Sequence, residues 1–340
     1  MIVLAILGAT GYTGRLIVEE ARRAGLPLRL VGRRPDALEE LADPHDEVRV
    51  ADGKDGAALR EAFAGAFAVA SIAGPFLEVG YEPVAAAIDA GAHYLDITGE
   101  QEFTRRVYDD FGPRAAERGL VLLSAFGMDY VPGDLAARIA GEQLEPPLDE
   151  LGVAYSFSGA GTSGGTKKTM ALLAGRPHAA WVGGRLVESR LGATSRTFTF
   201  PFGEAECQEW GGTEPLTVPR HTHVREVRSY ARIPKPIAKA APVAKPVLGL
   251  AARLMPEGPS PEDRARARIA VTAIARRGDE VSTATLTGLD PYGLTALLIV
   301  RGYEALRDGE ARGAGALAPA EAFDAWSFLA RLAPLLTLAD

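Results

Sequence analysis

The chain has 340 residues, of which 47% are hydrophobic and 24% are charged, and its formal net charge is -7 at pH 7. This length suits two domains with large cores, and the acidic balance argues against a nucleic-acid-binding protein. The single cysteine, Cys207, excludes an internal disulfide and a cysteine-based metal site. Because no apolar run reaches about 18 residues, we expect no membrane-spanning helix. The start of the chain lacks the pattern of a secretory leader, so we expect a cytoplasmic protein.

The first stretch of the chain has the order strand, glycine turn and helix. Residues 2–7 are all apolar, which is typical of a strand buried on both faces, and a helical pattern begins at residue 14. The glycines between them allow the backbone to approach a pyrophosphate, and the helix start offers N–H groups and the positive end of its dipole. An ordinary glycine turn is the alternative. We predict a dinucleotide-binding loop made of Gly8, Ala9, Thr10, Gly11, Tyr12, Thr13 and Gly14.

The end of the second predicted strand, residues 28–32, indicates which dinucleotide binds. An NAD site usually has an acidic residue there, which bonds the ribose 2′-OH. This chain has Arg33 and Arg34 instead, and two guanidinium groups suit a 2′-phosphate. We therefore predict NADP as the cofactor. The alternative is that both arginines are solvated loop charges.

The rest of the first half alternates short apolar strands with helices, which predicts a Rossmann-type, doubly wound parallel sheet. Asp52 ends the third strand, where it is expected near the adenine edge. The loop Ala73-Gly74-Pro75-Phe76 follows the fourth strand and is expected beside the nicotinamide, because ligands bind outside the carboxyl ends of the strands. The expected strands are 47–52, 67–73, 93–98 and 120–125, and the expected helices are 36–41, 57–63, 84–90 and 103–118.

After residue 127 the strand candidates become longer and alternate between apolar and polar residues. This pattern favours a second α+β domain with a mixed or antiparallel sheet. We predict an NADP-binding domain over residues 1–127, with the C-terminal segment 317–340 packing back on it. Residues 128–316 are expected to form a substrate and dimerisation domain. Its expected strands are 151–157, 195–200, 222–233, 267–276 and 280–288, and the expected helices are 135–141, 167–174, 292–306 and, beyond it, 318–332.

Two segments of the second region have an open role. Residues 159–166 form a glycine-rich loop that either approaches a ligand or is a plain connection. Residues 235–255 are rich in Ala, Pro and Lys, with scattered apolar side chains. A lid or surface excursion is the favoured interpretation of 235–255, and peripheral contact with a membrane is the alternative.

The candidate proton donors lie at the carboxyl ends of the predicted strands. Asp129 and Tyr130 follow the sixth strand, and we predict that they are catalytic. The alternative for Asp129 is a structural role as the N-cap of the next helix, because Asp is a preferred cap. Tyr81 and Glu100 lie at neighbouring strand ends and are further candidates for the proton donor, with a structural role as the alternative.

The remaining reactive side chains are expected to be structural. His221 and His223 alternate along a strand-like stretch, but no further ligands stand at a suitable spacing, so we predict no metal site. His93 starts a strand and is expected to be a satisfied structural histidine. Acidic neighbours are expected to raise the pKa of the Cys207 thiol and oppose its ionisation.

Three sets of residues form a recognisable series, namely 8–14, then 73–76 with 80–84, 93–96 and 99–100, and finally 126–134. This series resembles the saccharopine dehydrogenase-like oxidoreductases, especially the branch with the trans-acting enoyl reductases. Residues 163–166 resemble a loop of the family's second domain. The resemblance implies an NADP-binding domain, a substrate or dimerisation domain, hydride transfer as the usual chemistry, and a homodimer.

The second region has no Arg- and His-rich group that would bind a dicarboxylic amino acid, so a less polar substrate fits better. We predict an NADP-dependent reductase whose partner is a small, fairly apolar molecule such as an enoyl thioester. The alternative is an NADP-binding scaffold or sensor without catalysis. No tyrosine has a lysine four residues later, which argues against the Tyr-Lys pair of short-chain dehydrogenases.

Overall fold

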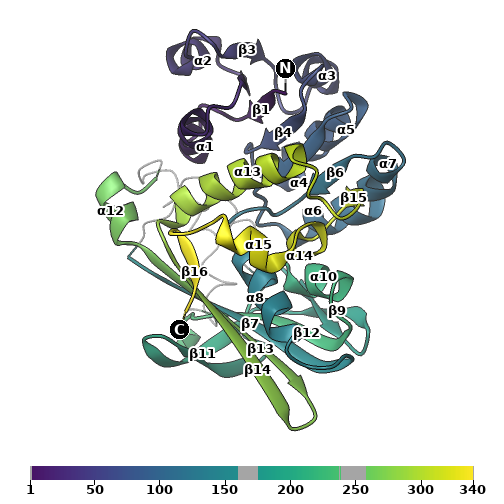
Figure 1. The fold of residues 1–340 in the computed structure, drawn as a ribbon, viewed down its shortest axis with the longest axis vertical. Coiled ribbons are helices and arrows are strands. Elements are labelled where there is room, and N and C mark those ends of the chain that lie inside the picture. The colour runs from purple at the N-terminus through teal and green to yellow at the C-terminus, as the bar shows by residue number, and fades with distance from the viewer. Residues whose placement is uncertain (1, 160–174, 237, 239–257, 340) are drawn as a thin grey trace. The chain divides into compact units, whose positions relative to one another are not determined.

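The computed structural model describes residues 2–159, 175–236, 238 and 258–339 (Figure 1). The expected helix 167–174, nearly all of the glycine-rich loop 159–166 and most of the segment 235–255 lie outside the described residues. The chain divides into two compact units. The first contains residues 1–127 and 295–317, and the second contains residues 128–294 and 318–340.

The first unit contains a parallel sheet, as the sequence predicted, and it has seven strands because β15 joins the six expected ones. Its strand order is β15-β6-β5-β4-β1-β2-β3, which is the doubly wound arrangement. The strands are β1 (Leu4–Leu7), β2 (Leu28–Gly32), β3 (Glu47–Val50), β4 (Ala68–Ser71), β5 (His93–Asp96), β6 (Val121–Leu123) and β15 (Gly315–Ala316).

The helices of the first unit follow the strands in alternation. The expected helix 103–118 is interrupted by a π-helical turn at Val107–Phe111. Pro113, the second residue after this turn, has no N–H for a regular helical hydrogen bond. The helices are α1 (Tyr12–Arg23), α2 (Pro35–Leu41), α3 (Gly56–Phe63), α4 (Phe76–Val79), α5 (Tyr81–Asp89), α6 (Gln101–Arg106), α7 (Gly112–Ala116) and α13 (Pro291–Arg307), of which residues 295–307 belong to this unit.

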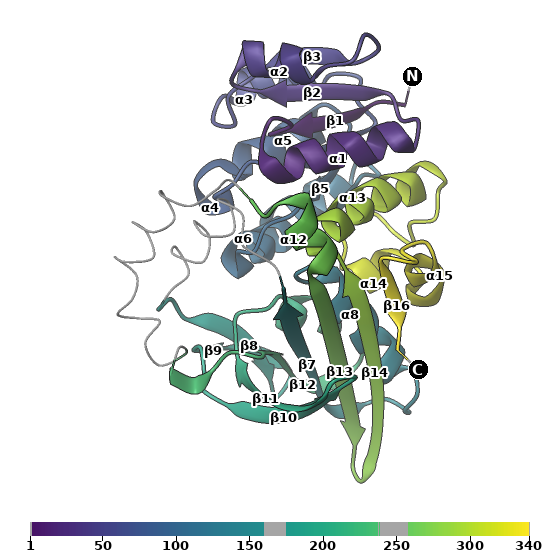
Figure 2. The same cartoon turned by 90° about the vertical axis from the view of Figure 1, so that its left-hand side faces the viewer.

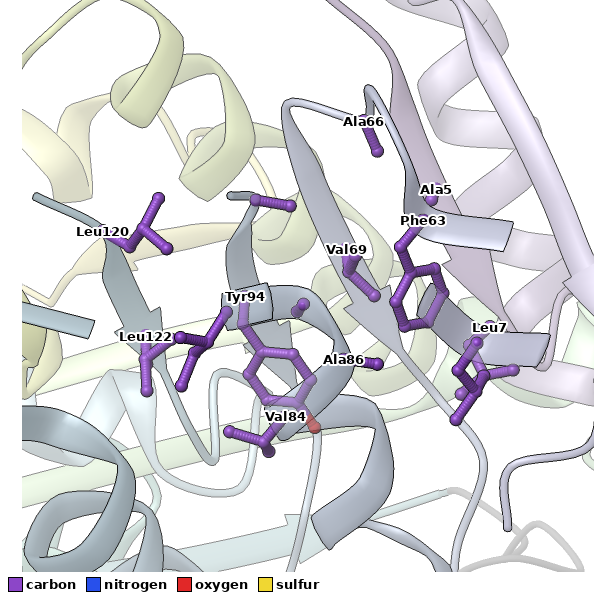
Figure 3. Close-up of a cluster of buried hydrophobic side chains, with 14 of the residues drawn as sticks. Ala5, Leu7, Phe63, Ala66, Val69, Val84, Ala86, Tyr94, Leu120 and Leu122 are labelled. Carbon is purple, nitrogen blue, oxygen red and sulfur yellow. The ribbon is translucent and has the colours of Figure 1, made fainter. Parts of the chain in front are cut away.

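A buried apolar cluster holds α3, α5, α6 and α7 against one face of the sheet (Figure 3). Leu7, Val69 and Tyr94 come from neighbouring strands, and Phe63 and Val84 come from α3 and α5. All five side chains are at most 2% exposed. Burial of such large apolar side chains stabilises the unit by roughly 1.5–3 kcal/mol each. This packing holds the ends of the strands in place, and with them the loops that follow the strands.

The chain returns to the first unit through residues 295–317, not through residues 317–340 as expected. The short strand β15 pairs in parallel with β6, and the Tyr303 hydroxyl donates to the Ile2 carbonyl at 2.6 Å. The following segment belongs to the second unit because β16 (Leu336–Leu338) pairs with β14 of that unit. The expected helix 318–332 is two short helices, α14 (Pro319–Ala322) and α15 (Ala325–Ala330), because Phe323 and Asp324 are extended.

The second unit contains a nine-stranded mixed sheet. Its main order is β10-β11-β12-β7-β13-β14-β16, with β8 and β9 added beside β12. The pair β12–β7 is parallel and the other pairs are antiparallel. The strands are β7 (Leu148–Ser158), β8 (His178–Val182), β9 (Arg185–Ser189), β10 (Ser195–Phe200), β11 (Gly203–Glu209), β12 (Val224–Ala231), β13 (Arg268–Arg277), β14 (Glu280–Leu289) and β16.

One helix packs on this sheet and directly precedes its first strand, β7, in the chain. Helix α8 (Val131–Gly141) packs on β7, β13 and β14 (Figure 2), and the Ser282 hydroxyl donates to the Ala140 carbonyl at 2.6 Å. Two short elements lie between β11 and β12, namely α10 (Glu214–Thr217) and a 3-10 turn at Val218–Arg220. Helix α12 (Pro261–Arg266) precedes β13. Within the described part of the chain, no helix is long and apolar enough to cross a membrane.

Candidate functional site

The predicted dinucleotide loop lies between β1 and α1 and folds closely on itself. Gly8 has φ of +87°, which side-chain-bearing residues rarely adopt. A Cβ on Gly14 would lie 2.2 Å from the Gly8 carbonyl oxygen and 2.9 Å from that of Ala9. The Gly11 N–H donates to the Gly8 carbonyl at 3.0 Å. The turn therefore requires glycine at positions 8 and 14, which gives a physical reason for the spacing in the sequence.

The start of α1 has the features of an anion site. Gly11 is the N-cap residue, and among the described residues no side chain caps the helix there. Its first turn contains no acidic residue. A 12-residue helix directs its dipole and first N–H groups toward this turn, so the loop can accept a phosphate group.

The two arginines after β2 lie at the edge of this loop. The Arg34 Nη2 atom is 3.2 Å from the Thr10 hydroxyl, so the structure brings these two predicted site residues together. The Arg33 Nη1 atom is 3.9 Å from an Asp52 carboxylate oxygen, and the Arg33 side chain is 76% exposed. Asp52 also accepts a hydrogen bond from the Lys54 N–H at 2.9 Å. Both guanidinium groups are thus exposed, Arg34 beside the loop and Arg33 next to Asp52.

Glu100 is a structural residue that holds the loop after β4. Its buried carboxylate accepts the N–H groups of Phe76 and Leu77, each at 2.8 Å. Ala73 lies next to the dinucleotide loop, since a Cβ on Gly8 would be 3.2 Å from the Ala73 nitrogen. The Phe76 side chain is 4% exposed and packs in the core of the unit, so this residue can border a cofactor only through its backbone, and the place of the loop beside the nicotinamide stays a prediction.

Tyr81 and Asp96 also have identifiable structural roles. The Tyr81 ring packs against Phe103, and the Arg106 guanidinium lies 4.4 Å above the ring centroid. One carboxylate oxygen of Asp96 accepts the N–H groups of Thr98 and Ala125, each at 2.9 Å. The latter bond holds Ala125 at φ of +58° where the chain leaves β6.

Asp129 and Tyr130 immediately precede α8 in the second unit. The N-cap residue is Tyr130, not Asp129, and no side-chain cap is present among the residues described there, so the capping alternative for Asp129 is wrong. Burial raises the pKa of the Asp129 carboxyl to about 6, although the residue as a whole is partly exposed. Tyr130 is 5% exposed, and its ring stacks with that of Trp210 at 6.1 Å between centroids.

A buried polar group stands beside this segment and was missed in the sequence analysis. The Tyr155 hydroxyl lies 3.3 Å from the Tyr130 carbonyl oxygen and 2.5 Å from a carboxylate oxygen of Glu214. The Ser229 hydroxyl donates to the other carboxylate oxygen. Burial raises the pKa of Glu214 to about 7, and the nearby charge of Asp134 also raises it, while the hydrogen bonds from Ser229 and Tyr155 lower it.

The histidines and the cysteine have structural surroundings. His221 precedes β12 and its Nε2 lies 3.0 Å from the Asp134 carboxylate, which also accepts the Ala320 N–H. The expectation that His221 and His223 alternate along a strand is therefore wrong, because β12 begins only at Val224. His93 Nδ1 accepts the Val121 N–H at 3.0 Å, which confirms its structural role. Cys207 is buried, and burial raises its pKa to about 11.

The carboxyl of Asp134 is ionised in this arrangement. Burial alone would raise the pKa of Asp134, but the charge and hydrogen bond of His221 and the N–H of Ala320 lower it below its usual value. Within the residues that the structure describes, no group of three His, Cys, Asp or Glu side chains could hold a metal ion.

Comparison with known proteins identifies the first region of the chain. A protein-family model described as NAD(P)H-binding matches residues 8–148. A saccharopine dehydrogenase-like oxidoreductase of Arabidopsis thaliana is 34% identical over 161 residues, which are 42% of this chain and 36% of that protein. A trans-acting enoyl reductase of Mycobacterium ulcerans is 32% identical over 179 residues, which are 49% of this chain and 43% of that protein. The matches thus span less than half the length of these relatives.

A solved structure matches the whole chain. The saccharopine dehydrogenase (L-Glu forming) of Saccharomyces cerevisiae is similar with a TM-score of 0.65 and 13% identity, and the match covers 100% of both chains. This likeness establishes the fold, a parallel Rossmann-type sheet followed by a second, mixed-sheet unit. The chain therefore has an NAD(P)H-binding region and resembles the saccharopine dehydrogenase-like oxidoreductases, as its motifs indicated.

Proposed function

We propose that this chain is an NADP-dependent reductase that acts on a small, fairly apolar substrate such as an enoyl thioester. The observation that carries the proposal is the closed glycine turn with Arg34 bonded to Thr10 at its edge. The NAD(P)H-binding match over residues 8–148 supports the cofactor class, and relatives named as trans-acting enoyl reductases support the substrate class.

The residues of the first unit fit a dinucleotide phosphate. Gly8 and Gly14 keep side-chain carbons away from a turn where a Cβ would meet backbone oxygen atoms. Arg34 is exposed beside this turn and Arg33 is exposed next to Asp52, and a guanidinium group can bind a 2′-phosphate in a bidentate manner. When bound, a reduced nicotinamide supplies the hydride.

Reduction of a carbon–carbon double bond also needs a proton, and Asp129 is the group that we assign to deliver it. Burial brings the pKa of Asp129 to about 6, so a useful fraction of the carboxyl is protonated at neutral pH. A proton donor with a pKa near the working pH combines availability with transfer rate. Tyr130 is assigned to orient the same segment, since its ring is fixed against Trp210.

The proposal is tested by fluorescence titration of NADPH and NADH into the purified protein and two variants. R33A/R34A removes both guanidinium groups at the loop edge, and R23A is the matched control because Arg23 lies at the far end of α1. We expect the wild type and R23A to bind NADPH more tightly than NADH. In R33A/R34A the NADPH affinity should fall by about tenfold or more, and the NADH affinity should change little. Equal affinities for the two cofactors in the wild type would contradict the NADP assignment.

The family resemblance also supports a homodimer as part of the proposal. Light scattering of the purified chain should then give twice the mass of one chain. A monomer at micromolar concentration would remove this part and leave the cofactor assignment intact.

A further inference from the structure

The carboxyl of Glu214 is the most enclosed acidic group of the second unit that the proposed reaction does not use. The residue is 0% exposed. A Cβ on Gly133 would lie 2.5 Å from one carboxylate oxygen, and a Cβ on Gly212 would lie 2.3 Å from the other. These two glycines therefore leave the space that the carboxyl fills. Among the described residues no cation pairs with it, and its carboxylate accepts hydrogen bonds from the hydroxyls of Tyr155 and Ser229 and from its own backbone N–H.

The Tyr155 hydroxyl has one proton and two acceptors. The Glu214 carboxylate oxygen is 2.5 Å away and the Tyr130 carbonyl oxygen is 3.3 Å away. When Glu214 is ionised, Tyr155 donates to the carboxylate, which is the stronger acceptor. When Glu214 is protonated, its own O–H can donate to the Tyr155 oxygen, and the Tyr155 proton is then available to the Tyr130 carbonyl. The protonation of Glu214 therefore decides which bond Tyr155 makes.

The Tyr130 carbonyl can accept this second bond. It already accepts the Asp134 N–H at 3.0 Å in the first turn of α8, and a carbonyl oxygen has two lone pairs. Tyr130 is the N-cap residue of α8 and directly follows Asp129. A bond from Tyr155 to this carbonyl therefore restrains the backbone segment that carries the assigned proton donor.

Several titratable groups face Glu214 from the elements around it. Asp134 on α8 lies close enough to raise its pKa, and His221, which follows the 3-10 turn, is bonded to Asp134. Tyr155 comes from β7. His178 on β8 faces the neighbouring Gly211 and is bonded to Glu209. Burial raises the pKa of Glu214 to about 7 against the hydrogen bonds from Ser229 and Tyr155, which lower it, and the charge of Asp134 adds to the rise. Both protonation states are therefore populated near neutral pH.

We propose that Glu214 is a positioning residue that acts through Tyr155, so that the proton on the Glu214 carboxyl controls how tightly the Asp129–Tyr130 segment is held. This inference rests on the proposed function only in its assignment of Asp129 as proton donor. The hydrogen-bond exchange itself is a property of the second unit.

Trp210 provides a reporter for this exchange. Its ring contacts both Tyr130, in a stack, and Tyr155, edge to face at 5.7 Å between centroids. The chain has three tryptophans, so W181F/W326F leaves Trp210 as the single emitter. We would titrate this background from about pH 5 to about pH 9 by fluorescence. In parallel, infrared spectroscopy would follow the carbonyl band of a protonated carboxyl.

In the background protein we expect one transition near pH 7 in the Trp210 signal and a matching loss of the carboxyl band. E214Q should lose the Trp210 transition and the part of the carboxyl band that ionises near pH 7. The carboxyls of Asp96 and Asp129, with pKa values of about 6, should keep their own part of the band in this variant. Y155F should keep the Glu214 carboxyl transition and lose the Trp210 response. H178Q is the matched control and should keep both. Absence of the Trp210 transition in the background protein, or its survival in E214Q or Y155F, would overturn the inference. If E214Q does not fold, the result for Y155F still decides.

NADPH binding measured on the same samples separates this inference from the proposed function. Binding without the Trp210 transition would refute the role of Glu214 and keep the NADP assignment. The transition without NADPH binding would refute the proposed function and leave the exchange between Glu214 and Tyr155 in place.

Discussion

Replacement of Glu214 by glutamine should change how the stability of the second unit depends on pH. Burial raises the pKa of this carboxyl from the ordinary 4.5 to about 7. In the unfolded chain the same group ionises near 4.5, so between about pH 4.5 and about pH 7 the folded protein holds a proton that the unfolded protein has lost. The free energy of unfolding must therefore fall as the pH rises through this window.

The size of the effect follows from the shift. A rise of the Glu214 pKa from 4.5 to about 7 corresponds to about 3 kcal/mol of unfolding free energy, at about 1.4 kcal/mol per pKa unit. Glutamine has the same shape and does not titrate. We therefore expect the wild type to lose about 3 kcal/mol relative to E214Q between about pH 4.5 and about pH 7, and nothing further above that range.

Urea unfolding followed by tryptophan fluorescence measures this difference. Trp181, Trp210 and Trp326 all lie in the second unit, so the signal reports that unit. E209Q is the matched control with the opposite sign. Burial would raise the pKa of Glu209, but hydrogen bonds from His178, Ser189 and Thr194, together with the charge of Arg228, lower it to about 2.

The stability that Glu209 contributes is fully present above about pH 4.5 and is lost only as the pH falls toward 2. The gap between the wild type and E209Q should therefore stay constant where the gap to E214Q changes. Parallel curves for the wild type and E214Q from about pH 4.5 to about pH 8 would refute the claim that Glu214 is protonated in the folded state.

Two further substitutions, each with a matched control, test the first unit. G14A places a Cβ 2.2 Å from the Gly8 carbonyl oxygen, so NADPH affinity should fall by about tenfold or more in a fluorescence titration. G11A is the control, because its Cβ would lie 3.3 Å from the same oxygen, and it should have a smaller effect. Equal effects of the two substitutions would contradict the close packing of the turn. R29L removes a buried guanidinium that donates to two backbone carbonyls and to Glu47, which should destabilise the unit by about 1–3 kcal/mol in thermal unfolding. R49L removes an exposed arginine from the same carboxylate and should cost less than about 1 kcal/mol, and similar losses for both arginine variants would contradict the role of burial.

The parts of the fold that were predicted from sequence depend on local patterns. The turn at residues 8–14 is recognisable because glycines with special backbone geometry are close in sequence, and β1 before it is apolar on both faces. Strand β15 was missed because it has two residues, and its partner β6 lies almost two hundred residues earlier. Such a short strand has no periodicity, and tertiary pairing alone defines it.

The region around Asp129 and Tyr130 could be predicted only in part, because some of its residues meet only through tertiary contacts. Asp129 and Tyr130 follow a recognisable strand end. Tyr155 and Glu214 are 59 residues apart and meet only because β7 and α10 are brought together in the second unit. Gly133 is a local sign of this close approach, because any larger residue there would place a Cβ 2.0 Å from the Tyr155 hydroxyl oxygen.

Oxidation of NADPH by a short enoyl thioester such as crotonyl-CoA tests the proposed activity most directly. Absorbance follows the cofactor, and mass spectrometry follows the saturated thioester. We predict that NADPH is oxidised with formation of one equivalent of saturated product, and that NADH reacts more slowly at equal concentration. NADPH that binds but is not oxidised by any of a series of enoyl thioesters of increasing chain length would contradict the reductase proposal and favour a cofactor-binding scaffold.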